Sequence, residues 1–163
     1  MGALFILALT PRLYSAVTLG WHWDAPGSFT LVNFDEGGSC RAALEGFGYS
    51  GFIGRQTTAL AALAGNGPQP AIRGNAPAVK AYCHGVEHMR VARVYSAVLG
   101  ALTPVVLVLM GFLLLPAQPA VGWIAGGLLA VSGFHIGESM VGTVDAASTF
   151  FIYLFLLMMI YAA

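Results

Sequence analysis

The stretch that decides the fold is VYSAVLGALTPVVLVLMGFLLL, from Val94 to Leu115, which contains no charged residue. A helix of this length, at 1.5 Å per residue, crosses the roughly 30 Å hydrocarbon core of a bilayer. Over the whole chain 58% of the residues are hydrophobic and only 9% are charged, with a mean hydropathy of +0.78. Because a soluble domain carries about 25% charged residues, the sequence predicts an all-α integral membrane protein.

Apolar stretches on both sides of this one extend the pattern. The sequence predicts about four transmembrane helices, over residues 1–21, 94–115, 120–137 and 146–163. The first carries Arg12 in its middle, and an arginine this deep in a bilayer needs a polar partner. A cleaved signal peptide is the alternative for that segment. In the third, Gly122 with Gly126 and Gly133 with Gly137 have the spacing that lets a second helix approach closely.

Residues 22–93 form a long polar loop domain between the first and second spans. Every lysine and arginine except Arg12 lies in this loop domain. Short interfacial helices are expected at residues 39–45 and 56–64, and a polar helix at residues 79–93 that continues into the second span. Gly65-Asn66-Gly67-Pro68 has the composition of a turn, and it ends the second of these helices.

The order of the spans places the acidic residues on one membrane face. The second span starts at the long loop and ends on the opposite face, so the third span returns to the loop side. Glu138 and Asp145 flank the connection after it, and therefore lie on the same face as Asp35 and Glu36. We expect the protein to react, or to bind its partner, on that face. A formal net charge of zero, without a basic run, gives nucleic acid no surface to bind.

The candidate reactive stretch of the loop is Asn33-Phe34-Asp35-Glu36-Gly37-Gly38. Two adjacent carboxylates suit proton transfer or metal binding, and the glycines after them free the backbone. The alternative is an ordinary solvated turn before a helix, where acidic residues are also common.

Several short motifs occur in an order that resembles the GT-C class of polytopic glycosyltransferases, in particular the protein O-mannosyltransferase and aminoarabinose-transferase-like superfamily. Arg93 opens the second span, small residues follow at 97–100, and Asp145 precedes an aromatic-rich last span. The acidic pair is similar to the pair in the family's first external loop, and Arg12-Leu13-Tyr14 to the arginine near the end of its first span. Family members have many more spans, so the chain resembles an N-terminal part of such an enzyme or a truncated relative.

The resemblance implies transfer of a sugar from a polyprenyl-phosphate donor to a protein, lipid or glycan hydroxyl. Asp35 would be the general base, with Glu36 beside it in the catalytic pair. Arg93 and Arg90 would bind the donor phosphate, which suits a planar guanidinium; anchoring among membrane lipid headgroups is the alternative for both. Asp145 would orient Asp35 or, together with it, hold Mg²⁺ or Mn²⁺.

Glu138 is a further candidate for substrate binding. It follows His135 by three residues, so the two share a helix face, as ligands or as a packed polar pair. A second cluster, Cys83 with His84 and His88, lacks the order of a zinc motif, and a structural role is favoured.

Cys40 and Cys83 both lie in the loop domain. They could form a disulfide if that side is oxidising, provided that their Cα atoms lie within about 7 Å.

The orientation and the function each have a competing interpretation. The basic residues of the loop would by the positive-inside rule place it in the cytoplasm, but the rule weakens for loops longer than about 60 residues. We follow the resemblance and predict an extracytoplasmic loop in a multi-pass protein of the inner or plasma membrane. The competing function is a non-enzymatic membrane subunit that docks on a larger complex through its glycine-rich third span; a transporter fragment is a third hypothesis.

Overall fold

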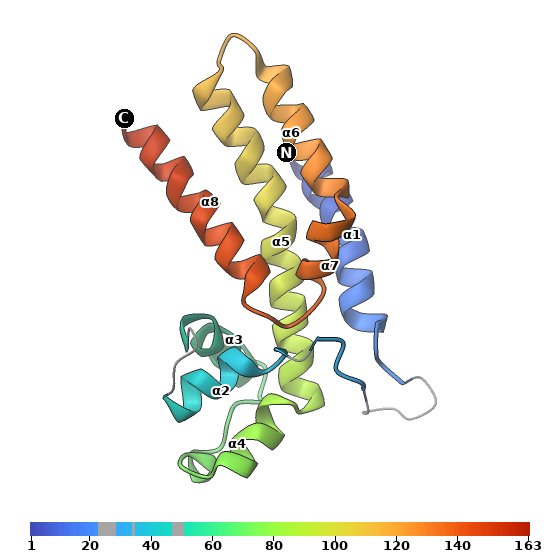
Figure 1. Ribbon diagram of the computed structural model, residues 1–163, viewed down its shortest axis with the longest axis vertical. Helices are drawn as coiled ribbons and strands as arrows, with labels where there is room; N and C mark the ends of the chain where they lie inside the picture. Colours follow the sequence, from blue (N-terminus) through green and yellow to red (C-terminus); the bar gives the residue numbers. More distant parts are fainter. Residues whose placement is uncertain (23–28, 34, 47–50) are drawn as a thin grey trace.

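The computed structural model describes residues 1–22, 29–33, 35–46 and 51–163, which form eight α-helices and one 3-10 helix. The longest elements are α1 (Gly2–Thr18), α5 (Val86–Leu114), α6 (Pro119–Val131) and α8 (Asp145–Ala162). They run along the long axis of the molecule, and the loop domain lies around one end of α5 (Figure 1). The described part of the chain has no strand beyond an isolated bridge between Trp21 and Phe29. The predicted all-α class is therefore confirmed for these residues.

Two helices, α5 and α8, are long and apolar enough to cross a membrane. A third candidate span is α6 together with α7 (Gly133–Ser139), although the two are bent by 60° at Ser132. Helix α1 is apolar but shorter, with 17 residues. The structure therefore supports two or three spans, and the predicted four are not confirmed. The predicted span over residues 120–137 consists of two helices, because the chain breaks between α6 and α7, and its crossing of the membrane stays a prediction.

Helix α6 packs tightly against α5 through its glycines. A Cβ atom at Gly122 would lie 2.8 Å from the carbonyl oxygen of Val108, and one at Gly126 would lie 2.7 Å from that of Pro104. Any larger side chain at either position would push the two helix backbones apart. The predicted close approach at Gly122 and Gly126 is therefore confirmed, with α5 as the partner helix. At Gly133 and Gly137 no other helix of the described chain approaches, because a Cβ atom at either position would have no neighbour within 4 Å.

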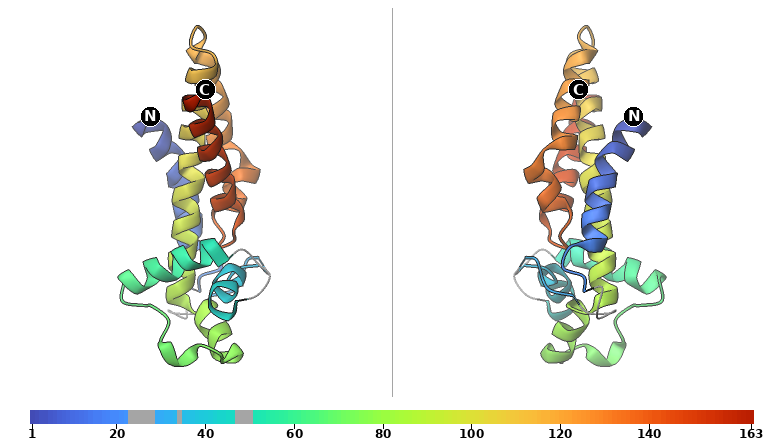
Figure 2. Two further views of the ribbon diagram at one scale, coloured as in Figure 1. Left: turned by 90° about the vertical axis from the view of Figure 1, so that its left-hand side faces the viewer. Right: turned by 90° about the vertical axis from the view of Figure 1, so that its right-hand side faces the viewer.

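The described part of the loop domain contains four short helices: α2 (Gly38–Glu45), α3 (Gly51–Leu63), the 3-10 helix η1 (Pro70–Ile72) and α4 (Ala76–Cys83). Figure 2 shows them gathered around the start of α5, beyond the ends of the long helices. The predicted helices at 39–45 and 56–64 correspond to α2 and α3. The predicted helix at 79–93 is instead divided between α4 and the first turns of α5, because the chain turns at His84 and Gly85.

A disulfide between Cys40 and Cys83 joins α2 to α4, with the two Cα atoms 5.7 Å apart. Val79 packs beside it, and all three side chains are buried. The disulfide closes a loop of the chain with a sequence separation of 43 residues, which restricts the unfolded chain and stabilises a domain with a small apolar core.

Candidate functional site

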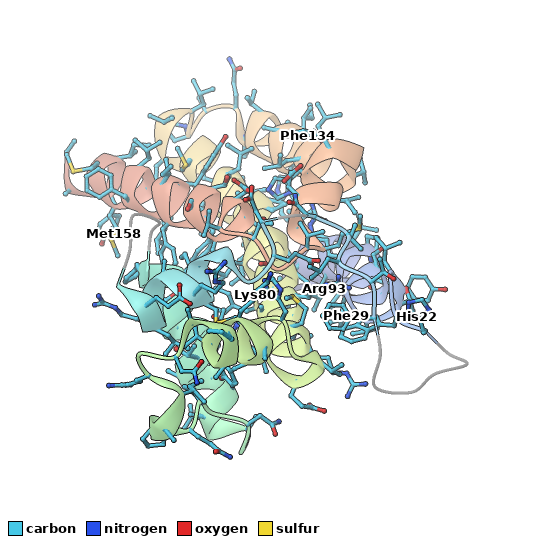
Figure 3. The ribbon with its side chains drawn as sticks, turned by 60° about the horizontal axis from the view of Figure 1, so that its bottom comes forward. His22, Phe29, Lys80, Arg93, Phe134 and Met158 are labelled. Atoms are coloured by element: carbon cyan, nitrogen blue, oxygen red, sulfur yellow. A yellow bond between two sulfur atoms is a disulfide. The ribbon has the colours of Figure 1, made fainter. Side chains whose placement is uncertain are left out.

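A buried ion pair between Glu36 and Arg93 lies where the loop domain meets the long helices. Arg93 Nε donates to Glu36 Oε1 at 2.7 Å, and Arg93 Nη2 donates to Glu36 Oε2 at 2.9 Å. The exposed fraction of each side chain is 1% or less. Figure 3 shows Arg93 beside Phe29, and the guanidinium carbon lies 5.5 Å from the centre of that ring. The pair is therefore bidentate and shielded from solvent.

The Glu36–Arg93 pair also bonds to three other segments. Arg93 Nη1 donates to the carbonyl oxygen of Leu19, just after α1, at 2.6 Å. Glu36 accepts from the backbone N–H of Val32 at 3.0 Å and from that of Gly142, in the α7–α8 connection, also at 3.0 Å. The hydrogen bond from Gly142 brings this connection into direct contact with Glu36; their common membrane face stays a prediction. A single ion pair holds α1, the loop, α5 and the α7–α8 connection together.

The environment of Glu36 keeps its carboxylate ionised. Burial alone would raise the pKa of Glu36, but hydrogen bonds from Arg93 and Gly142, together with the charge of Arg93, outweigh burial and hold the pKa below its ordinary value. A carboxylate that already accepts from four N–H groups is a poor base and has little capacity left for a substrate. The geometry therefore suits a positioning role for Glu36; its predicted place in a catalytic pair stays a prediction.

Asp35 differs from its neighbour, because it is only half-buried. Its backbone is fixed on both sides: its N–H donates to Asn33 Oδ1 at 2.9 Å, and its carbonyl oxygen accepts from the N–H of Gly38, also at 2.9 Å. Gly37 has a φ of +83° and lies against the ring of His84, so the turn needs glycine there. No described residue donates to the Asp35 carboxylate. Phe34 of the same motif lies outside the described residues.

Arg90 lies one turn before Arg93 on α5, and its side chain is exposed. The two guanidinium groups lie over the same ring, that of Trp21, each with its carbon 5.3 Å from the ring centre. Arg90 also pairs loosely with Glu87 at 3.7 Å. It stands at an otherwise apolar groove between α3 and α5, lined further by Leu60, Val91, Val94, Tyr95 and Val98. The contact of the two arginines with Trp21 was not predicted from the sequence.

Glu138 and Asp145 line one pocket of about 360 Å³ at the start of α8, together with Phe134, His135, Ala146 and Thr149. Asp35 is not among the lining residues. The structure therefore brings Glu138 and Asp145 together but does not place Asp35 with Asp145. Within residues 1–22, 29–33, 35–46 and 51–163, no three His, Cys, Asp or Glu side chains are arranged to hold a metal ion. Binding of Mg²⁺ or Mn²⁺ by Asp35 and Asp145 stays a prediction, and we derive no step through a metal.

Arg12 has the polar partners that its depth requires. Its side chain is fully buried, and its donors reach the carbonyl oxygens of Ala8 at 2.6 Å, Ala130 at 3.0 Å and Leu129 at 3.4 Å. Nη2 also lies 2.8 Å from His135 Nδ1. Leu129 and Ala130 stand at the end of α6, where the carbonyl oxygen of Leu129 also accepts from the N–H of Ser132 at 3.3 Å and that of Ala130 accepts from Arg12. Arg12 therefore caps α6 and holds the bend between α6 and α7.

The predicted disulfide between Cys40 and Cys83 has a consequence for the second cluster of the loop. Cys83 is oxidised and offers no thiolate for zinc. His84 closes the space beside Gly37, and His88 is buried against the ring of Tyr82 at 5.2 Å between ring centres. The structural role favoured for this cluster agrees with these contacts.

Comparisons with protein-family models, with curated proteins and with solved structures find no match to this chain. The likeness to GT-C glycosyltransferases therefore stays a prediction from the sequence motifs. Two features of the structure bear on that likeness: the half-buried carboxylate of Asp35, whose backbone is fixed, and the exposed side chain of Arg90 at an apolar groove.

Proposed function

We propose that the chain is a multi-pass integral membrane glycosyltransferase, or part of one, that transfers a sugar from a polyprenyl-phosphate donor to a hydroxyl acceptor. The observation that carries the proposal is the position of Asp35. Its carboxylate receives no hydrogen bond from any described residue, while the adjacent Glu36 is locked to Arg93. A base must be held in place but must keep its oxygens free, and this arrangement meets both needs.

In the proposed reaction Asp35 accepts the proton of the acceptor hydroxyl as that oxygen attacks the anomeric carbon of the sugar. The new C–O bond forms on the face opposite the bond to the donor phosphate, which breaks, so the configuration is inverted. The bonding electrons leave with the polyprenyl phosphate. Asp35 then releases its proton to water, and the cycle needs no oxidant or further reactant.

Arg90 is the residue that we assign to the donor phosphate. Its guanidinium is exposed, and the groove beside it presents Val91, Val94 and Val98 on one face of α5. These valines lead along the helix into its uncharged stretch, so an isoprenoid chain could lie on them while its phosphate pairs with Arg90. Arg93 is assigned to positioning, because its donors are already bonded to Glu36 and Leu19.

The disulfide supports an extracytoplasmic loop. Disulfides persist in oxidising compartments and are rare where glutathione and thioredoxin keep thiols reduced. The Cys40–Cys83 bond is buried and joins two helices of the loop domain, as expected of a structural disulfide. We therefore assign the loop domain, and the reaction with it, to the outer face of the membrane.

Asp35→Asn tests the assignment of the base. The variant keeps the size and polarity of the side chain and removes its negative charge. In lipid nanodiscs with a polyprenyl-phosphate sugar we expect turnover to fall by about 10²- to 10⁴-fold, the usual contribution of a general base, with an unchanged melting temperature. Asp24→Asn makes the same change elsewhere in the loop and should retain the parent rate. Parent turnover in both variants would remove Asp35 as the base, whereas an absence of turnover in the parent protein itself would favour a non-catalytic membrane subunit.

Arg90→Gln provides a second measurement on the same enzyme. Because Arg90 is assigned to the donor, this variant should raise KM for the polyprenyl-phosphate sugar more than it lowers kcat. An unchanged KM would leave Arg90 as an anchor among lipid headgroups.

A further inference from the structure

Helix α3 lies across the direction of the long helices, at the level where the loop domain meets them (Figure 2). Its 13 residues extend for about 20 Å, at 1.5 Å per residue. At the same level on α5 the charged residues end, because Arg93 is followed by the uncharged stretch 94–115. Helix α3 therefore has the position of a helix that lies in the plane of a membrane surface.

One side of α3 is turned toward the apolar part of the long helices. Phe52 packs against Phe151 of α8, with 5.6 Å between the ring centres. Gln56 accepts a hydrogen bond from the Tyr95 hydroxyl of α5, and Leu60 lines the valine-rich groove beside that helix. Positions 52, 56 and 60 are four residues apart, so they share one face of α3. This face is directed along the long helices, toward the expected bilayer.

The opposite side of α3 holds the rest of the loop domain. Gly54 lies directly against the backbone of Ser39 in α2. Thr57 and Thr58 are buried, and the hydroxyl of each donates to the carbonyl oxygen of Gly54, at 3.2 Å and 2.8 Å. Ala61 is also buried. The loop domain thus covers this side, and the apolar side chains of the other face are the ones directed toward the bilayer.

That other face stays largely uncovered within the described chain. Phe52 is 56% exposed and Leu60 is 40% exposed. Arg55 is the one charged residue of α3; it is exposed, and no described carboxylate lies within ion-pair distance of it. An apolar face with a basic residue beside it is typical of helices that bind a lipid surface, because arginine attracts lipid phosphates while apolar side chains enter the acyl boundary.

We propose that α3 binds the lipid surface, resting in the headgroup layer with Phe52 and Leu60 at the acyl boundary and Arg55 beside lipid phosphates. The occupant of the uncovered face is lipid and not a second protein. Leu63 is the last residue of α3 and is 86% exposed. It lies among the hydrated headgroups, where water-soluble reagents reach it.

The contact would fix the height of the candidate site above the lipid. Helix α3 packs against α2, and α2 begins directly after the turn that contains Asp35. The proposal concerns membrane contact alone. It does not depend on glycosyl transfer at Asp35, and the two proposals can fail separately.

Quenching of a fluorophore on α3 tests the proposal. Cys40 and Cys83 are paired, so Leu60→Cys supplies the thiol that a nitrobenzoxadiazole dye labels. The labelled full chain is placed in nanodiscs of phosphatidylcholine and phosphatidylglycerol. We expect emission at shorter wavelength than in water, strong quenching by doxyl groups on the lipid chains and little quenching by iodide in the buffer. At Leu63→Cys we expect quenching by both.

Three further positions make the result decisive. Phe52→Cys probes the same face and should behave like Leu60→Cys, so it serves if Leu60→Cys does not fold. Gln69→Cys, at an exposed position before η1, should be quenched by iodide alone. Leu156→Cys, at a position of α8 that is 43% exposed, should be quenched by the lipid groups alone.

The proposal is overturned if the dye at positions 52 and 60 is quenched by iodide as strongly as at position 69, because the face then lies in water. It is also overturned if neither agent quenches the dye there, because protein then covers the face. Absence of lipid quenching at position 156 would overturn the membrane insertion on which α3 depends.

Discussion

Replacing Glu36 by glutamine tests whether the Glu36–Arg93 pair organises the site. The variant keeps the shape of the side chain but leaves Arg93, which is 1% exposed, without its counter-ion. Breaking a buried ion pair in this way costs about 3–5 kcal/mol. In a chain of this size each kcal/mol lowers the melting temperature by about 2–4 °C, so we expect a fall of roughly 6–20 °C. The measurement is a thermal scan in one fixed detergent, and the neighbouring half-exposed Asp35→Asn is the control, with a change within about 0.5 kcal/mol.

A second variant checks the physical reason. Glu36→Leu combined with Arg93→Met replaces both charges by apolar groups, and such replacements of buried ion pairs are often neutral in stability. The double variant should therefore be more stable than Glu36→Gln. If Glu36→Gln melts like Asp35→Asn, the pair does not organise the site. If it melts normally but loses turnover, Glu36 belongs in the catalytic pair that the family resemblance implies.

The same pair makes stability depend on pH in a defined direction. The pKa of Glu36 is held below its ordinary value in the folded protein, so the unfolded chain binds the proton more tightly. Its contribution to stability is fully present above the ordinary glutamate pKa, about 4.3, and is lost as the pH falls through the lower pKa of the folded state. Glu36→Gln should therefore lose less stability than the parent between neutral and acidic pH.

Two further predictions concern orientation and the buried arginine of α1. Cys40 and Cys83 are paired, so an introduced cysteine is the thiol that a maleimide can label. Leu63→Cys, whose position is 86% exposed, should react with a membrane-impermeant maleimide in intact cells. Gln118→Cys should react only after lysis, and the opposite pattern would reverse the orientation. Arg12→Leu removes the side chain that bonds to the carbonyl oxygen of Ala130 and to His135. Because these acceptors lose their partner, the variant should lower the free energy of unfolding by about 2–4 kcal/mol. The measurement is the melting temperature, which should fall. Thr10→Val, an exposed change on the same helix, should have little effect, and equal melting temperatures would show that Arg12 does not hold the bend.

The outline of the fold could be predicted from the sequence because it depends on local composition. The uncharged run at 94–115 indicated the long helix, and the spacing of Gly122 and Gly126 indicated a close helix contact. The break at Ser132 could not be predicted in this way. Residues 120–137 contain no charged residue that would mark a break. The carbonyl oxygens of Leu129 and Ala130, at the end of α6, accept from Arg12, which lies 117 and 118 residues away from them in the sequence. A local pattern does not reveal such a distant donor.

The sequence indicates the candidate site as a stretch, but the different surroundings of its two carboxylates could not be predicted from it. Adjacent carboxylates at Asp35 and Glu36 look alike in a sequence, yet one is half-exposed and the other is fully buried. The difference arises from partners far along the chain: Arg93 lies 57 residues from Glu36, and Gly142 lies 106 residues from it. The N–H of Gly142 reaches the Glu36 carboxylate because glycine can lie close to α5. A Cβ atom at this position would lie 3.1 Å from Met89 Sδ.

The arginines that carry the family resemblance have different surroundings, and this bears on where a donor could bind. Arg12 and Arg93 are both buried, and both donate to backbone carbonyls that would otherwise lack partners. Their charges are committed to holding α6 and α1 in place, so a lipid phosphate would have to displace existing bonds to reach them. Arg90 is exposed, shares the Trp21 ring with Arg93 and has only a loose carboxylate partner in Glu87. Of these three arginines, the one that can bind an anion without unfolding its surroundings is Arg90, and the donor site is therefore best sought along its valine-lined groove.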